Sequence, residues 1–124
     1  MANEEHLALL TQGVATWNDW RRVNLGIRLD LSRSDLSEAN LSEVDLRGTD
    51  LSKANLFEAN LRNADLRLAR LVDANLYRAD LSGANLTNAE VGGANLSGAN
   101  FFRVHLREAE KNGVVVRAEE ESLK

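Results

Sequence analysis

The amino-acid sequence predicts an all-β solenoid with a helical segment in front of it, and three observations support this. From Leu29 to Glu108 the chain repeats a five-residue unit sixteen times without an insertion. The middle residue of each unit, called position i, is Leu in all but two units, and position i−2 is mostly Ala. The first 28 residues do not follow the repeat, and their apolar residues have helical spacing instead.

A period of five fits neither of the ordinary elements. Steps of five on an α-helix rotate each leucine by roughly 140°, so the leucines would spiral around every face. On one long strand an odd period would send successive leucines to opposite sides. Positions i−2 and i share the two-residue spacing of a strand, and the other three residues must then turn the chain. Such a chain winds around a central core, and only stacked coils bury the leucines.

The side chains at position i are predicted to fill the axis of the coil, and the intervening residues to face water. These core residues are Leu31, Leu36, Leu41, Leu46, Leu51, Leu56, Leu61, Leu66, Leu71, Leu76, Leu81, Leu86, Val91, Leu96, Phe101 and Leu106. Position i−2 lies near a corner and must be small. Asp or Asn at i−1 is expected to hydrogen-bond to backbone groups of a turn. The glycines at i+2 (Gly48, Gly83, Gly93 and Gly98) mark a corner that could need a positive φ.

The repeated run A-(D/N)-L-x-x resembles the pentapeptide-repeat family, and it covers 80 of the 124 residues. The resemblance implies a right-handed quadrilateral β-helix with one unit on each side, so that sixteen units make four coils. The sequence itself supports four sides only weakly, through similar residues at a spacing of twenty. Arg47, Arg67 and Arg107 recur at this spacing or its multiple, and Phe57 precedes Tyr77 by twenty.

Residues 1–28 are predicted to form an N-terminal helical cap. The apolar residues at helical spacing are Leu7, Leu10, Val14 and Trp17. Asn3 is placed to cap the helix N-terminus, and Gly13 is expected to kink or divide the helix. The open end of a β-helix exposes apolar core and unpaired backbone, so an amphipathic lid is the natural interpretation. A membrane-surface or partner helix is the alternative, but its polar face would be more basic.

Residues 109–124 depart from the repeat and are predicted to be a C-terminal cap or tail. A turn at 112–113 precedes three valines at 114–116, which are β-prone. These valines could pair with the last coil, which is the favoured hypothesis, or form an edge for a second subunit. The chain is therefore expected to be a monomer or a dimer joined through a chain end.

Composition narrows the classes of function. The net charge is −4, from 15 basic and 19 acidic residues spread along the chain, which does not favour a nucleic-acid binder. The absence of Cys excludes disulfides and thiolate metal sites. The N-terminus has no signal-peptide pattern, and no apolar run reaches the 18–20 residues of a membrane span. These features predict a cytoplasmic protein without a membrane segment.

No catalytic, metal-binding or cofactor-binding residue is predicted, and an enzyme is not expected. The many Ser and Asp residues arise from the repeat, and no His is placed beside them to activate a nucleophile. His105 takes the i−1 position of the last unit, and the only other histidine, His6, belongs to the opposite end. His105 is therefore interpreted as a surface or turn residue.

Several outward positions are candidates for surface contacts. Phe57 and Tyr77 occupy i+1 on one side and are expected to stack as exposed aromatics. Phe102 occupies i+1 on the next side, and Leu68 and Val72 flank the second and third coils. A contiguous patch of such residues would indicate a partner.

Two sets of charged residues are interpreted as structural. Arg47, Arg67 and Arg107 form a broken basic row beside Asp45 and Asp65, and they are expected to be solvated or paired in preference to binding phosphate. Arg70 replaces the usual Asp or Asn at i−1 and is expected to form a charge ladder with Asp50 and Glu90.

The favoured function is a non-enzymatic scaffold that presents flat faces to a protein partner. The alternative, taken from the resemblance, is a DNA-mimicking regulator of a type II topoisomerase such as gyrase. Residues 29–68 hold eight acids and five bases, whereas residues 69–108 hold four of each. Such a mixed surface is a poor copy of the phosphate spacing of DNA.

Overall fold

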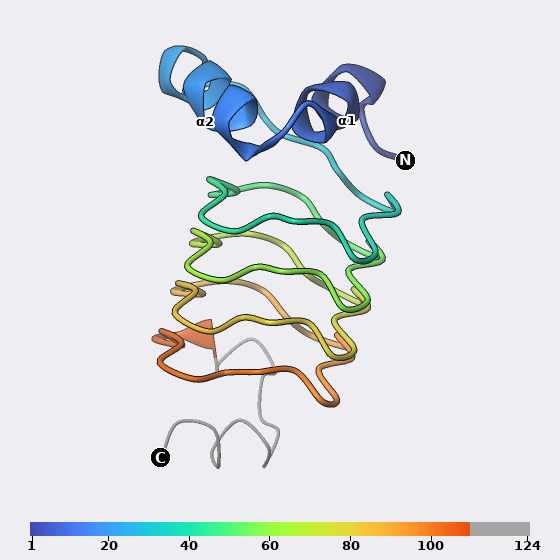
Figure 1. Cartoon of the computed structure of the whole chain (residues 1–124), viewed down its shortest axis with the longest axis vertical. Coiled ribbons are helices and arrows are strands. Elements are labelled where there is room, and N and C mark those ends of the chain that lie inside the picture. The colour runs from blue at the N-terminus through green and yellow to red at the C-terminus, as the bar shows by residue number, and fades with distance from the viewer. Residues whose placement is uncertain (110–124) are drawn as a thin grey trace.

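The computed structural model describes residues 1–109 and has two parts, a pair of helices and a regular coil (Figure 1). Helix α1 spans Glu4–Thr11 and helix α2 spans Val14–Val23. Both helices lie across the N-terminal end of the coil, whose turns stack below them (Figure 1). Neither helix in this part of the chain is long and apolar enough to cross a lipid bilayer.

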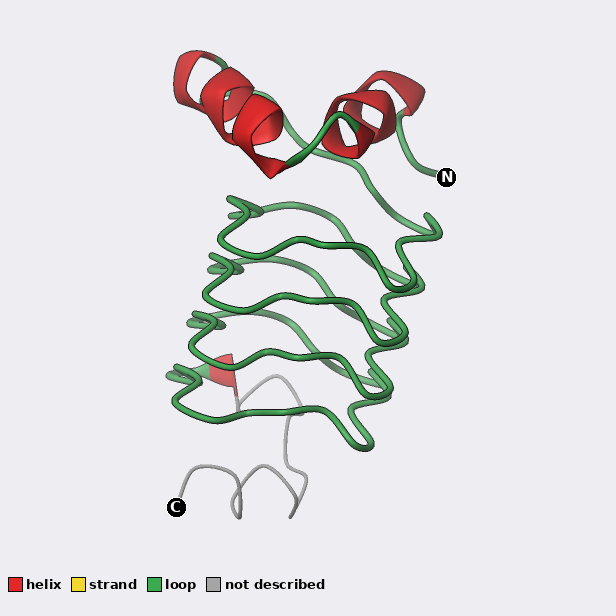
Figure 2. Ribbon diagram, in the orientation of Figure 1, coloured by secondary structure: helices red, strands yellow, loops and turns green. Residues whose placement is uncertain are grey.

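Residues twenty apart pair in parallel along the coil, from Asp30 with Asp50 to Asn85 with His105. Each paired residue is the i−1 residue of its unit, so four units complete one turn. The pairs are isolated bridges, and the described coil contains no continuous strand (Figure 2). The reason is that a corner follows each bridge within three residues.

The four sides of the coil are named here by their bridged residues. Side 1 carries Asp30, Asp50, Arg70 and Glu90; side 2 carries Asp35, Asn55, Asn75 and Asn95; side 3 carries Asn40, Asn60, Asp80 and Asn100; side 4 carries Asp45, Asp65, Asn85 and His105.

The corner of each unit is a β-turn with a left-handed residue at i+2. In the second turn of the coil, for example, the N–H of Ala54 donates to the carbonyl of Leu51 at 3.0 Å. All sixteen i+2 residues have a φ between 52° and 74°. Twelve of them are not glycine, so the sequence-based expectation that linked positive φ to the glycines was too narrow. The corner imposes this conformation on whatever residue occupies it.

The Asp or Asn at i−1 stabilises the same corner. Its Oδ1 accepts a hydrogen bond from the N–H two residues later in thirteen of the sixteen units, as between Asp50 and Ser52 at 2.9 Å. The three exceptions are the units with Arg70, Glu90 and His105 at i−1. The repeat therefore retains Asp or Asn because both side chains accept from a backbone N–H.

The core of the coil is a stack of position-i side chains. All sixteen are buried except Leu106, in the last unit, which is only partly buried. The i−2 side chains lie beside them, and most are alanines with almost no exposed surface. Burial of each leucine contributes about 1.5–3 kcal/mol before the entropy of ordering the chain is counted.

The helices form a cap, as the sequence predicts. Asn3 caps α1 by accepting hydrogen bonds from the N–H groups of Glu5 and His6 at 2.9 and 3.1 Å. Gly13, with a φ of 112°, divides the segment into two helices where the sequence allowed either a kink or a break. Leu10 and Trp17 are buried against the leucines of the first turn.

Helix α2 also supplies hydrogen bonds to the backbone of side 4, where no earlier turn is available. Trp17 Nε1 donates to the carbonyl of Asp45 at 2.7 Å, and Asn18 Oδ1 accepts from the N–H of Asp45 at 2.9 Å. Arg21 donates to the carbonyl of Arg47 at 3.1 Å. The helix thus satisfies backbone groups that would otherwise be buried without a partner.

Side 1 is closed in a similar way by the segment around α1. The N–H of Asn3 donates to the carbonyl of Asp30 at 2.9 Å, and the N–H of Asp30 donates to His6 Nδ1 at 3.2 Å. Together the helical segments bond to the backbone of sides 1 and 4 and, through Asn18 Nδ2 at 3.0 Å, to the carbonyl of Glu43 at the end of a side 3 unit.

Of the predicted C-terminal segment 109–124, only Ala109 is described, and it is fully buried. The predicted turn at 112–113 and the pairing of residues 114–116 lie outside the described residues.

Replacement of Leu66 by Asp is expected to unfold the coil. Leu66 has no exposed surface. Truncation of such a leucine to Ala costs about 2–5 kcal/mol, and a buried carboxylate without a partner adds to this cost. Ser82→Ala, at an outward position, is the control and should leave thermal melting followed by circular dichroism nearly unchanged. Equal melting temperatures for both variants would contradict the inward assignment.

Replacement of Trp17 by Phe is expected to lower the free energy of unfolding by about 1–3 kcal/mol, because the carbonyl of Asp45 loses its buried donor. Trp20→Phe is the matched control: Trp20 is only partly buried, and its indole N–H donates to no residue in the described part of the chain. Chemical denaturation measures both. A cost for Trp20→Phe as large as that for Trp17→Phe would show that apolar burial alone fixes the cap.

Candidate functional site

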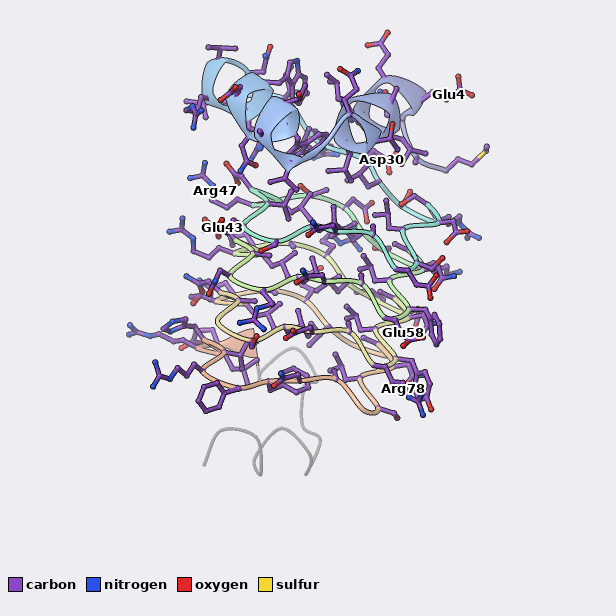
Figure 3. All side chains as sticks on the ribbon, in the orientation of Figure 1. Glu4, Asp30, Glu43, Arg47, Glu58 and Arg78 are labelled. Carbon is purple, nitrogen blue, oxygen red and sulfur yellow. The ribbon has the colours of Figure 1, made fainter. Side chains whose placement is uncertain are left out.

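The outward side chains at i+1 and i+2 form the walls of the coil. Figure 3 shows Glu43 and Arg47 pointing outward at one edge, and Glu58 and Arg78 at the opposite edge. Because the backbone repeats every twenty residues, each outward position lies against its equivalents in the neighbouring turns. Rows of aligned side chains are therefore the units from which a surface site can be built.

On side 2, Phe57 and Tyr77 stack across consecutive turns. Their ring centroids are 5.9 Å apart and the ring planes differ by 16°. The guanidinium of Arg78 lies 5.2 Å from the centroid of the Tyr77 ring, which is the geometry of a cation–π contact. Together with the resemblance, the sequence predicts this stack, because the four units per coil that the resemblance implies place the two residues one turn apart. It predicts exposed rings, however, and the structure corrects this, because each ring partly covers the other and both are partly buried.

A row of polar side chains fixes the aromatic pair in place. Asn75 Nδ2 donates to Asn55 Oδ1 at 3.3 Å, and Asn55 Nδ2 donates to Asp35 Oδ1 at 3.4 Å. Asn55 and Asn75 also accept from the N–H groups of Phe57 and Tyr77, both at 3.1 Å. The aromatic pair is thus presented by rigid backbone and not by a mobile loop.

On side 4, Arg47 and Arg67 are held by carboxylates of their own units. The Nε and an Nη of Arg47 donate to the two carboxylate oxygens of Asp45, both at 2.8 Å. Arg67 contacts Asp65 in the same way, at 2.8 and 2.6 Å. These hydrogen bonds raise the pKa of both guanidinium groups. Paired arginines of this kind are poor phosphate ligands, which agrees with the interpretation from the sequence.

The remaining predicted positions are not brought into one site. Arg107 and His105 are exposed in the last turn, and neither forms an ion pair with residues 1–109. Arg70 pairs with Glu90 at 2.9 Å, but among the described residues it has no ion pair with Asp50, so the predicted three-residue ladder is only a pair.

Phe102 on side 3 is the most exposed aromatic ring of the described chain, at 57%. The guanidinium of Arg103 lies 5.2 Å from its ring centroid. Both residues line a hollow of about 200 Å³ with Arg62 and Ser82. Arg62 also lies 3.5 Å from the carboxylate of Asp80, so one of the two arginines that line this hollow is already paired.

Side chains that could bind a metal ion or take part in catalysis are scattered along the described coil. Residues 1–109 contain no group of three or more side chains that could hold a metal ion. Four surface hollows in this part of the chain have volumes of about 200–300 Å³, at or below the lower end of the range for small-molecule sites.

Three carboxyl groups of the first turn have a pKa below the usual value of 3.8. Hydrogen bonds from the hydroxyl and N–H of the following serine lower the pKa of Asp30 and of Asp35. Burial raises the pKa of Asp45, but hydrogen bonds from Arg47 and the charges of Arg21 and Arg47 outweigh that effect. A carboxyl with a lowered folded-state pKa stabilises the fold above its unfolded pKa, and this contribution is lost as the pH falls through the folded value.

The melting temperature is therefore expected to fall as the pH is lowered from about 5 to about 2. The double variant Asp30→Asn, Asp35→Asn should show a smaller fall, because an amide oxygen still accepts from the serine and does not titrate. Thermal melting across this pH series tests the difference. A double variant with the same pH dependence as the original protein would show that other groups control acid unfolding.

The repeat matches the model of a known protein family. The family model for pentapeptide repeats matches residues 28–52, 54–90 and 79–110, in eight copies. No curated protein matches the chain.

Solved structures similar to the chain include two pentapeptide repeat proteins. One is a pentapeptide repeat protein from the thylakoid lumen of Arabidopsis thaliana, with 37% identity and a TM-score of 0.60 over 60% of this chain and 52% of the other. The second is a pentapeptide repeat protein from the cyanobacterium Cyanothece 51142, with 38% identity and a TM-score of 0.51 over 61% and 56%. The chain thus matches little more than half the length of each.

The likeness to these structures identifies the coil as a right-handed β-helix solenoid. The family model covers well over half of the chain, from residue 28 to residue 110 with a gap at residue 53 only. The chain therefore belongs to the pentapeptide-repeat family.

Proposed function

We propose that the chain is a non-enzymatic scaffold, a quadrilateral β-helix of four coils that presents its flat sides to a protein partner. The observation that carries this proposal is the stack of Phe57 on Tyr77 on side 2. Neither ring belongs to the core cluster, so packing of the core does not account for them. Aromatic residues and arginine are enriched in protein–protein interfaces, and Arg78 lies against this pair.

The rigidity of the wall supports the same function. The N–H and carbonyl groups around both rings are bonded to neighbouring turns, as in the bond from the N–H of Glu58 to the carbonyl of Tyr77 at 2.9 Å. A partner that docks here would not have to order a mobile segment, and binding would lose little conformational entropy.

The DNA-mimic alternative has less support. A DNA mimic needs continuous rows of negative charge. On side 4 the carboxylates of Asp45 and Asp65 are each neutralised by an arginine of the same unit. On side 2 the bridged row contains one aspartate followed by three asparagines.

The scaffold proposal predicts a partner that depends on the aromatic pair. The tagged full chain is used to capture proteins from an extract of its own organism, and each captured protein is then purified and tested for direct binding. The double variant Phe57→Ser, Tyr77→Ser should weaken this binding by about ten-fold or more, because it removes two interface aromatics.

Phe102→Ser is the matched control, because it removes an exposed aromatic ring from side 3 and should leave binding unchanged. Melting temperatures confirm that all variants are folded. Recovery of the same proteins by the tag alone would contradict the scaffold proposal. Full binding by the double variant would exclude side 2 as the docking face.

A further inference from the structure

The two helices leave half of the first turn of the coil uncovered. On sides 1 and 4 the cap bonds to both the N–H and the carbonyl of Asp30 and of Asp45. The equivalent residues on sides 2 and 3 are Asp35 and Asn40. Their N–H and carbonyl groups form no hydrogen bond with any residue from 1 to 109. Both residues are exposed, whereas their counterparts in the next turn are partly buried. Sides 2 and 3 therefore begin with a bare backbone edge.

The hydrogen bonds between turns show what such an edge can bind. The N–H of each i−1 residue donates to the i−2 carbonyl of the turn before it, and its carbonyl accepts from the N–H at position i of that turn. On side 3 these bonds join Asp80 to Ala59 at 2.9 Å and to Leu61 at 2.8 Å. Asn40 offers the same donor and acceptor to a segment that is not there. An extended peptide supplies the matching groups, as in β-strand addition.

The chain itself covers part of another side in this way. Asn3 has extended dihedral angles, with a φ of −71° and a ψ of 122°. Its N–H donates to the carbonyl of Asp30 at 2.9 Å, as the N–H of Leu31 donates to the carbonyl of Asp50 at 2.8 Å between turns. Extended backbone is therefore an occupant that this end of the coil already accepts.

A hollow of about 230 Å³ adjoins the bare edge of side 3. It is lined by Leu10 and Gly13 from the helical segment and by Leu36, Ala39 and Leu41 from the coil. Leu36 and Leu41 are 5% and 3% exposed, whereas the position-i leucines of the next turn have no exposed surface. Position i faces the axis throughout the coil, so the position-i side chain of an added segment would point into this hollow.

The corners at both ends of this edge are acidic. Glu38 precedes side 3 and Glu43 ends it, and both are exposed. Neither carboxylate forms an ion pair with residues 1–109, and neither does Glu58, one turn below Glu38. Figure 3 shows Glu43 and Glu58 at opposite edges of the coil. In the first two turns of side 3 the only cation is Arg62, which pairs with Asp80. Unpaired carboxylates at both corners favour a basic segment.

We infer that the N-terminal edge of side 3 is the docking site for an extended basic segment of a protein partner. The segment lies along Asn40, accepts a hydrogen bond from its N–H and donates one to its carbonyl. An apolar side chain of the segment enters the hollow, and lysines or arginines on either side of it face Glu38 and Glu43. This inference goes beyond the proposed function, which concerns the flat sides of the coil.

Two other arrangements are less favourable. The edge of side 2 has Arg33 at its first corner, so it attracts a basic segment less than side 3 does. The helices lie across this end of the coil, so the last turn of a second copy could not stack on the first turn (Figure 1). A single strand needs only the outer edge.

A fluorescent peptide of sequence KKAKLKK is the probe, titrated against the full chain at low ionic strength and followed by anisotropy. The chain should bind this peptide with its alanine at i−2 and its leucine at i. Methylation of the leucine backbone nitrogen should weaken binding by about ten-fold or more, because the carbonyl of Asn40 loses its donor. Methylation of the preceding lysine nitrogen is the matched control and should leave binding unchanged, because the N–H at i−1 points away from the coil.

Ala39→Leu should weaken binding by about ten-fold or more, because the added side chain fills the hollow. Its melting temperature should not fall, since Leu29 and Val44 already occupy position i−2 of the first turn in buried form. The peptide KKSKSKK, which lacks the apolar anchor, and the acidic peptide EEAELEE should not bind.

The double variant Glu38→Gln, Glu43→Gln should weaken binding about three-fold or more, and added salt should weaken binding to the unmodified chain. Glu5→Gln, Asp73→Asn is the matched control, because it removes the same charge from exposed carboxylates that have no ion pair with residues 1–109. This control should bind as the original chain does.

Several outcomes would overturn the proposal. They are no binding of KKAKLKK at millimolar concentration, equal binding of the two methylated peptides, unchanged binding by Ala39→Leu, and an equal loss in the charge control. Light scattering that shows a dimer which Ala39→Leu dissociates would make a second copy the occupant. The double variant Phe57→Ser, Tyr77→Ser should bind the peptide unchanged. A loss there would place the peptide on side 2, whereas failure of the edge alone leaves the scaffold proposal standing.

Discussion

The β-helix depends on a corner at every fifth residue, because only a corner of this kind returns each leucine to the common axis. The i+2 residue of every unit takes a left-handed φ for this purpose. For residues other than glycine this conformation is unfavourable, and it persists only where the surroundings fix it. Here the conformation is fixed by the hydrogen bonds of each corner, both to the next turn and within the corner. The N–H of Lys53, for example, donates to Val72 in the next turn, while Asp50 accepts from Ser52 in the same corner.

The same constraint separates residues that determine the fold from residues that are free to carry function. Positions i−2, i−1 and i are occupied by the packing and hydrogen bonding of the corner. Positions i+1 and i+2 point outward and need only a side chain that tolerates their conformation. Some outward side chains are larger and more apolar than this requirement demands, as at Tyr77, Phe102 and Leu68. These residues are therefore the most informative about contacts outside the molecule.

Much of the core and of the cap could be predicted from the sequence, because both depend on spacing alone. The burial of Leu66 follows from the period of five. The stacking of Phe57 on Tyr77 also needs the period of twenty, which the resemblance to the family implies and the sequence alone supports only weakly. The bond from Trp17 to the carbonyl of Asp45 could not be predicted, because it depends on the angle at which α2 crosses the first turn. A hollow of about 300 Å³ that Leu25 and Leu68 both line could not be predicted for a similar reason, because only the path of the chain after α2 brings Leu25 to the same hollow as Leu68.

The pairing of residues at a constant separation of twenty has a consequence for changes in length. Inserting one residue would shift the register of every later unit, so that every later leucine would move from the axis to the wall. Inserting or deleting a whole turn would leave each remaining residue above and below an equivalent neighbour. A coil of this kind can therefore lengthen or shorten only in steps of whole turns. Each step adds or removes one complete ring of outward side chains.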